Sequence, residues 1–213
     1  MGQDITRANP DQIEPGEEYE WYDNATFGGY ERKGIPVQKT KAQYDFYEKQ
    51  AEAACTFQVS ESGGATCQIG RLLEIDGEPD QTLKLEMDPV WRGFLNQIGL
   101  GTCEITFLTY VADDDTPEFT TDKSDWYDSQ THVQASKKNG GSDAYEDWEM
   151  AELYVEPDDI SDGDVLRFAT AVTVSGTADR LYSSSEADAF TDDDTDNYPD
   201  GHISYGTVTV SWT

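Results

Sequence analysis

Hydrophobic and polar residues alternate along much of the chain after residue 53, and this alternation predicts β-strands. Three runs are separated by turn signals rich in Ser, Gly, Asp and Pro: ACTFQV (54–59), ATCQIGRLLEI (65–75) and QTLKLEM (81–87). Three more strands are expected at 102–111, 164–174 and 202–213. In 164–174 the large residues share one face and the small ones the other: Leu166, Phe168, Val172 and Val174 against Ala169 and Ala171, with Thr170 among the larger set.

One segment has a helical pattern instead. In DPVWRGFLNQIGLG, Asp88 suits an N-cap, Pro89 the first helical position and Gly99 the C-terminal stop. The apolar residues recur at the three- and four-residue spacing of a single helix face: Val90, Trp91, Phe94, Leu95 and Ile98. We therefore expect one short inserted helix, with its apolar face in the core.

The segment THVQASKKNGGSDAYEDWEMAELYV predicts a β-hairpin. Asn139, Gly140 and Gly141 divide it, and these residue types accept the positive φ angles of a tight turn. Many short strands without βα alternation indicate an all-β sandwich or barrel. The strand count and long loops favour a single jelly-roll domain over residues 51–213.

Residues 1–50 differ in composition from the rest of the chain. They are rich in Tyr and contain its only basic clustering, at Arg32, Lys33, Lys39, Lys41 and Lys49. We interpret them as an extended N-terminal arm. The alternative is an ordinary edge strand followed by a short helix near residues 43–54, a stretch long enough for two or three helical turns.

The charge of the chain is strongly acidic. It has 44 Asp and Glu residues against 14 Lys and Arg, and its formal net charge is −30. Residues 111–213 hold 25 of the acids and only 5 of the bases. A disordered chain would have few aromatics, whereas this one has 5 Trp, 12 Tyr and 8 Phe. We therefore expect a folded protein adapted to high salt, where screening reduces self-repulsion. Without a basic stripe, nucleic acid is not expected as a direct partner.

Residues 190–201, FTDDDTDNYPDG, carry the densest cluster of acids. Asp192, Asp194 and Asp196 match the first three ligand positions of an EF-hand loop, but the sixth position is Asn197 and the twelfth is Ile203. The turn glycine and the bidentate Glu are both missing, so we predict no metal site there. ADDDTPE (112–118) is a second acidic loop, and we interpret both as hydrated surface.

The three cysteines allow one intrachain disulfide at most. Cys55 and Cys67 occupy similar places on two strands that flank the turn SESGG, which makes them the candidate pair. The alternative is that they are buried thiols, which the expected cytoplasmic synthesis favours. If Cys55 and Cys67 pair, Cys103 is the spare thiol.

The sequence contains no motif for catalysis or for a cofactor. It has no G-x-S-x-G, no H-E-x-x-H and no P-loop, and no secretory signal or span of about 20 apolar residues. Its two histidines, His132 and His202, lie in or beside predicted strands and are expected to be structural. We therefore expect a protein that is not an enzyme and that binds no cofactor.

An acidic, signal-less, all-β chain with long loops resembles the major capsid proteins of tailless icosahedral viruses of halophilic archaea, whose virions enclose a membrane. The resemblance covers about Cys55 to Thr213 and includes the closing pair DGDVLRFATAVTV and YPDGHISYGTVTVSWT. It implies an upright single jelly roll that forms an icosahedral shell with copies of itself and a second capsid protein. It also implies localisation in the virion and an N-terminal arm that reaches neighbours or the internal membrane, with the basic residues from Arg32 to Lys49 facing an acidic neighbour or lipid headgroups. In such a lattice Cys103, or any of the three cysteines, would be available to bridge subunits.

Two other functions remain open at this point. One is a different virion or cell-surface structural protein, such as a tail or turret component. The other is a sugar-binding β-sandwich, in which exposed aromatics such as Trp126, Tyr127 and Trp148 line a groove. The competing interpretation of these residues places Trp148 in the core and Trp126 in an acidic loop.

Overall fold

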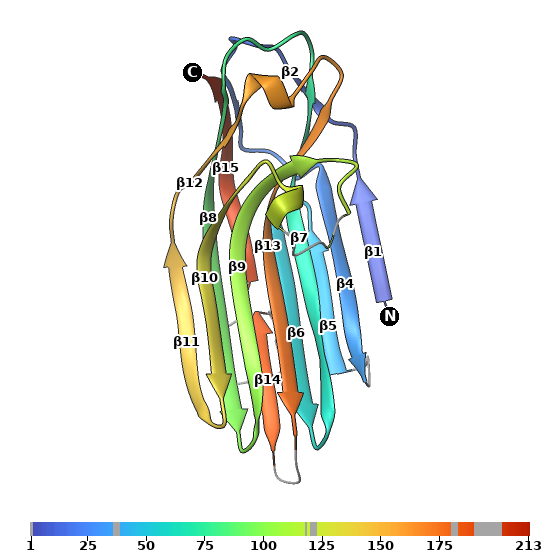
Figure 1. The fold of residues 1–213 in the computed structure, drawn as a ribbon, viewed down its shortest axis with the longest axis vertical. Helices are drawn as coiled ribbons and strands as arrows, with labels where there is room; N and C mark the ends of the chain where they lie inside the picture. The colour runs from blue at the N-terminus through green and yellow to red at the C-terminus, as the bar shows by residue number, and fades with distance from the viewer. Residues whose placement is uncertain (1, 36–38, 118, 120–122, 180–182, 190–201) are drawn as a thin grey trace.

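The protein is a β-sandwich of two sheets, described from a computed structural model (Figure 1). The structure describes residues 2–35, 39–117, 119, 123–179, 183–189 and 202–213. Sheet A contains β1 (Gly2–Arg7), β2 (Asp11–Ile13), β4 (Phe27–Ile35), β7 (Glu61–Ile75), β9 (Gly101–Asp113), β10 (Asp128–Lys138) and β13 (Val165–Ala178). Sheet B contains β3 (Tyr19–Trp21), β5 (Thr40–Asp45), β6 (Gln50–Gln58), β8 (Leu83–Ile98), β11 (Gly141–Trp148), β12 (Ala151–Val155), β14 (Ser184–Ala189) and β15 (His202–Trp212). The described pairings are antiparallel except that of β2 with β7.

The two sheets have matching strand orders. Sheet A runs β4-β7-β13-β9-β10, and sheet B runs β5-β6-β14-β8-β11. Each place along this order therefore holds two consecutive strands, one in each sheet: β4 and β5, β6 and β7, β13 and β14, β8 and β9, and β10 and β11. Three of the connections between them are described completely, and each is two residues long: 59–60, 99–100 and 139–140. We call these connections arches, and they lie together at the lower end of Figure 1.

Backbone hydrogen bonds join the arches to one another and to the neighbouring β13–β14 connection. Asn139 donates its N–H to the carbonyl of Gly101 (3.1 Å), and Asp179 donates to that of Leu100 (3.0 Å). Val59 donates to the carbonyl of Ser183 (3.4 Å). Positive φ angles make the sharp turns possible, as at Asn139 (58°) and Gly99 (72°). The ends of the two sheets thus form a continuous hydrogen-bonded row.

The predicted hairpin at residues 131–155 is wrong in its pairing, although its turn is correctly placed. Strands β10 and β11 flank Asn139 and Gly140, but β10 pairs with β9 in sheet A and β11 pairs with β8 in sheet B. The turn is an arch, so the chain crosses the core instead of folding back within one sheet.

The predicted helix at residues 88–99 is also wrong, because these residues continue β8. Along β8 the odd-numbered residues from Leu83 to Gln97 are buried and the even-numbered ones are more exposed. Asp88, which suggested an N-cap, instead stabilises a β-bulge. Its carboxylate accepts hydrogen bonds from the backbone N–H groups of Gly206 (2.8 Å) and Thr207, where the register of β15 shifts. Pro89 is tolerated beside this irregularity because it needs no ladder donor there.

The first fifty residues do not form an arm outside the sandwich. Within their described part, β1 and β4 extend sheet A through β7, while β5 pairs with β6 and β3 pairs with β15 in sheet B. Their Tyr-rich alternation reflects strands with one packed face: Tyr30, Tyr44 and Phe46 pack against the main core. Among the described residues no helix has the length and apolarity needed to cross a membrane.

The main core fills the space between the sheets with large aromatic and aliphatic side chains. Trp91 of β8 stacks on Phe107 of β9 in the opposite sheet, with ring centroids 6.5 Å apart, and on His132 of β10, at 4.8 Å. The face prediction for 164–174 is confirmed: Phe168, Val172 and Val174 belong to this core. Ala169 and Ala171 lie in a second, smaller cluster on the outer face of sheet A.

Candidate functional site

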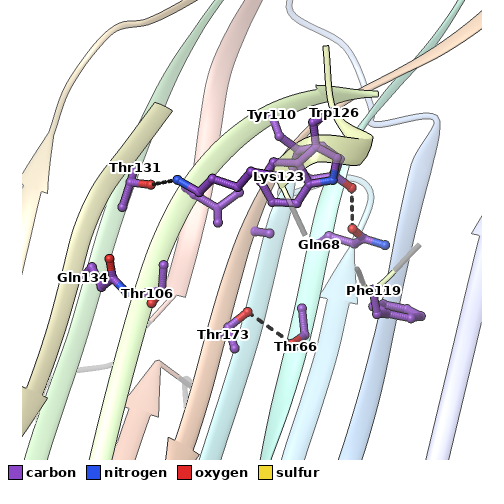
Figure 2. Close-up of a pocket in the computed structure, with 12 residues that line it drawn as sticks. Thr66, Gln68, Thr106, Tyr110, Phe119, Lys123, Trp126, Thr131, Gln134 and Thr173 are labelled. Carbon is purple, nitrogen blue, oxygen red and sulfur yellow. Dashed lines mark hydrogen bonds between the residues drawn. The ribbon is translucent and has the colours of Figure 1, made fainter. Parts of the chain in front are cut away.

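A pocket of about 200 Å³ opens on the outer face of sheet A (Figure 2). Its floor is formed by rows of residues across four adjacent strands. The strand registers place Thr66, Thr173, Thr106 and Gln134 in one row. They place Gln68, Ala171, Leu108 and Thr131 in the next. The pocket exists because small side chains at the centre of these rows leave room above the sheet.

An aromatic pair forms one wall of the pocket. Tyr110 belongs to β9, and Trp126 follows the 3₁₀ turn η2 (Lys123–Asp125) in the connection between β9 and β10. The two rings are stacked with centroids 4.8 Å apart and planes 24° from parallel. Phe119 completes the apolar lining on another side (Figure 2). The site thus combines a rigid aromatic surface with hydroxyl and amide groups.

Arg167 supports this wall from below. Its side chain is fully buried, and its guanidinium lies over the rings of Phe27 and Tyr110, 5.2 and 5.8 Å from their centroids. It also donates a hydrogen bond to the carbonyl of Thr116 (3.0 Å), at the start of the connection that carries Trp126. The buried cation therefore holds both the strand and the loop that form the aromatic pair.

Hydrogen bonds within the pocket fix several of its polar groups. Tyr110 donates its hydroxyl to the Oε1 atom of Gln68 (2.5 Å). The Lys123 ammonium donates to the hydroxyl of Thr131 (2.8 Å), and the hydroxyls of Thr66 and Thr173 are 3.1 Å apart. The amide nitrogen of Gln68 is buried and has no hydrogen-bond partner in the structure. One donor of the pocket is therefore left for a ligand.

Of the three aromatics expected to line a groove, only Trp126 lines the pocket. Tyr127 packs against the main core, and burial raises the pKa of its hydroxyl to about 12. Trp148 lies on the outer face of sheet B with 65% of its surface exposed, so core packing was the wrong interpretation for it. The threonine and glutamine rows were missed because they depend on which strands are neighbours, and these neighbours are distant in sequence.

The basic residues expected to contact a partner are dispersed over the molecule. Arg32 and Lys33 lie on β4 in sheet A, whereas Lys41 lies on β5 in sheet B. Lys33 pairs with Glu31 (2.6 Å), and Lys39 lies 3.9 Å from Glu61. Lys49 donates to the carbonyls of Tyr22 and Gly206, which ties the β5–β6 turn to β15. Their partner-binding role stays a prediction.

The cysteine expectations need correction. All three thiols are free and buried in the structure, so Cys55 and Cys67 are not bridged. Their strands lie in opposite sheets, and Cys67 instead donates to the carbonyl of Gln43 (2.9 Å). Cys103 is fully buried, so the folded subunit does not offer it to an interface. Burial raises the pKa of each thiol, which suppresses the reactive thiolate.

A metal centre is not found among the residues that the structure describes, since no three His, Cys, Asp or Glu side chains there are placed to hold an ion. The acidic segment 190–201 lies outside the described residues. In the other acidic loop, Asp114 pairs with Arg7 and lies 4.0 Å from Arg167, so one of its carboxylates has a structural role.

His132 leads to a prediction on pH. Its ring is buried between Trp91 and Thr109, with Glu149 at 3.4 Å, and burial lowers its pKa below the usual 6.5. The unfolded chain therefore binds a proton at this residue at a higher pH than the folded protein does. We expect the free energy of unfolding to fall as pH drops from 7 through 6.5 to the lower folded pKa, by up to about 1.4 kcal/mol per pH unit.

Urea unfolding of the wild type and of His132→Gln, from pH 7.5 to 5.0, tests this expectation. Other groups titrate in both proteins, so the difference between their unfolding free energies isolates His132. That difference should shrink as pH falls. A difference that stays constant over this range would contradict the buried, neutral state of the imidazole.

No protein-family model matches the chain, and no curated protein matches it significantly. Among solved structures, a glycoside hydrolase domain of Endo-D from Streptococcus pneumoniae R6 is 14% identical, with a TM-score of 0.32 over 88% of this chain and 22% of that chain. A family 11 carbohydrate-binding module from Clostridium thermocellum is 11% identical, with a TM-score of 0.24 over 89% of this chain and 88% of that one.

A structure of infectious bursal disease virus, Gx strain, is 12% identical, with a TM-score of 0.26 over 85% of this chain and 38% of that chain. The chain thus spans less than a quarter of the S. pneumoniae structure and less than half of the viral one. TM-scores this low do not assign the chain to a fold family or a function.

Proposed function

We propose that this protein is a carbohydrate-binding β-sandwich and that the pocket on sheet A is its sugar site. The observation that carries the proposal is the composition of that pocket. A sugar ring has apolar C–H faces and polar hydroxyls around its rim, so it needs both aromatic and hydrogen-bonding partners. The stacked Tyr110–Trp126 pair supplies the aromatic surface, and the threonine and glutamine rows supply the hydrogen-bonding groups.

The pocket supports binding rather than hydrolysis. Glycosidases use a pair of carboxyl groups on either side of the scissile bond. The described lining residues include no Asp or Glu, although the chain has 44 of them. Its volume of about 200 Å³ is also below the range of about 300–1,000 Å³ typical of sites that enclose a drug-sized ligand. A single sugar unit of a longer chain, held at the surface, fits this size.

A pocket-filling variant tests the proposal. Thr173 lies in the middle of the first row, between Thr66 and Thr106, and Thr173→Tyr places a ring in the cavity. Calorimetric titration against a panel of soluble oligosaccharides should give saturable one-to-one binding for wild type and at least tenfold weaker binding for this variant.

The matched control is Thr209→Tyr, because Thr209 is half-buried on sheet B and lies outside the pocket. It should bind like the wild type. Equal binding by wild type and Thr173→Tyr would mean that the sugar site lies elsewhere. An absence of binding across the whole panel would contradict the proposed function.

We also propose a second candidate function, an icosahedral shell subunit of a virion that assembles with itself and a second capsid protein. An exposed apolar group on sheet B favours it. Val90 and Trp148 are register partners on β8 and β11, and Met150 lies two residues after Trp148 in the chain. All three are more than 40% exposed. Exposed apolar clusters of this kind often mark interfaces between proteins.

The strand order supports a jelly-roll connectivity for this sandwich. Eight strands form four consecutive pairs, β6/β7, β8/β9, β10/β11 and β13/β14, and the two strands of each pair occupy matching places in opposite sheets. That arrangement is expected when four two-strand units are wound together, as in jelly rolls, which serve both as viral capsid domains and as lectins. The fold is therefore compatible with both proposed functions.

Assembly leads to a prediction on salt. At about 1 M salt the Debye length falls to about 3 Å, so the charge of −30 no longer keeps subunits apart and apolar contacts drive association. Light scattering should detect assemblies in molar KCl that dissociate on dilution, and Trp148→Glu should remain monomeric at every salt concentration. Wild type that is monomeric throughout, even with a partner shell protein added, would contradict this candidate.

A further inference from the structure

The pocket on sheet A differs in charge from the rest of the protein. Its described lining has one cation, Lys123, and no carboxylate. The chain as a whole has about three acids for every base. A surface this acidic would be expected to place carboxylates around a depression of this size. Their absence from the described lining removes the groups that would repel an anion at contact distance.

Lys123 also differs from other lysines of the protein in its hydrogen-bond partner. Lys33, Lys84 and Lys137 each pair with a carboxylate, from Glu31, Glu86 and Asp143 respectively. The ammonium of Lys123 instead bonds the hydroxyl of Thr131, and the described residues provide no carboxylate partner for it. An ammonium has three N–H donors, so two remain for a ligand.

Gln68 adds a second donor. Its side chain is 99% buried in the second row of the pocket floor, where its Oε1 atom is occupied by the Tyr110 hydroxyl. This contact orients the amide, whose nitrogen is a hydrogen-bond donor. That nitrogen has no partner, and in Figure 2 it lies on the side of Phe119, within the pocket lining. A buried amide donor without a partner is matched by an acceptor on a ligand.

From these observations we propose that the pocket selects an acidic sugar, a hexuronate unit whose carboxylate pairs with Lys123 and whose ring oxygens accept from Gln68 and the threonine hydroxyls. This inference rests on the proposed sugar-binding function and specifies its ligand class. The stacked aromatic pair packs against the sugar ring, and the ammonium of Lys123 distinguishes a uronate from its neutral counterpart. Lys123 is the specificity-determining residue.

The protein's own charge opposes an anionic ligand at long range. This opposition depends on the ionic strength, since screening at about 1 M KCl confines electrostatic interactions to about 3 Å. Under those conditions only contacts inside the pocket decide the preference. Binding is therefore measured in about 1 M KCl, where the field of the remaining acids does not mask the effect of Lys123.

The test uses ligand pairs in which methyl esterification removes the charge of each carboxylate. Trigalacturonate and its fully methyl-esterified form have the same rings and linkages, as do trimannuronate and its methyl ester. Calorimetric titration should show that the wild type binds one of the acids about tenfold or more tightly than its ester, as a charge-assisted hydrogen bond predicts. Lys123→Met should remove this preference, and Lys123→Arg should keep it.

Acetate is the remaining control ligand, because it has a carboxylate but no sugar ring. It should not displace the bound uronate at equal concentration. Equal affinity for acid and ester, or displacement by acetate, would overturn the acidic-sugar inference and leave the sugar-binding function standing. An absence of binding by acidic and neutral sugars alike would overturn both.

Discussion

Replacing Trp126 with alanine is expected to weaken sugar binding by about thirtyfold or more, corresponding to the 2 kcal/mol or more of a central aromatic anchor. Trp126 stacks on Tyr110 and forms the wall of the pocket, so its removal takes away the apolar surface on which a sugar ring packs. Because Trp126 is only partly buried and follows a short 3₁₀ turn, the fold should survive the change.

Trp148→Ala is the matched control for this experiment. It removes the same side chain from the outer face of the opposite sheet. Calorimetry with the tightest oligosaccharide of the panel should show unchanged affinity for Trp148→Ala and a large loss for Trp126→Ala. The reverse ranking would place the sugar site on sheet B and would contradict the assignment of the pocket.

Replacing Trp91 with alanine is expected to have the largest effect on stability. Trp91 is 4% exposed and contacts both Phe107 and His132 across the core, so its loss leaves a cavity between the sheets. Truncation of a buried tryptophan costs about 3–5 kcal/mol of unfolding free energy. Urea unfolding in about 1 M KCl, which screens the acidic surface, measures this difference.

Two further variants make this result interpretable. Trp148→Ala, from an exposed position, should change the unfolding free energy by less than about 0.5 kcal/mol. Trp91→Phe should lie between the alanine variant and the wild type, because it keeps an aromatic ring against Phe107. A loss below about 1 kcal/mol for Trp91→Ala would mean that this side chain does not fill the space between the sheets.

The sequence predicted the all-β class because alternation is a local property. The strand around residues 164–174 shows this clearly: its large face is in the main core, and Ala171 on its small face forms part of the pocket floor. The segment 88–99 was misleading because its apolar residues fit the helical period, although the strand divides them between its two faces. Trp91 and Leu95 lie on the buried face of β8, while Val90 and Ile98 lie on the exposed one.

The pairing of strands could not be predicted in the same way. Asn139 and Gly140 indicate a tight turn, but the residues alone do not reveal whether the next strand returns to the same sheet or enters the opposite one. The pocket could not be predicted without knowing which strands are neighbours. Thr66 and Thr173 face each other although 107 positions separate them, and Trp126 reaches the site through a long connection.

The row of arches also determines how this sandwich opens. At that end each arch joins facing strands through only two residues, and neighbouring arches are hydrogen-bonded to one another. The sheets are therefore joined at one end, and we expect them to separate first at the opposite end. Gly99 and Asn139, which lie in the arches, would be at the hinge of this motion.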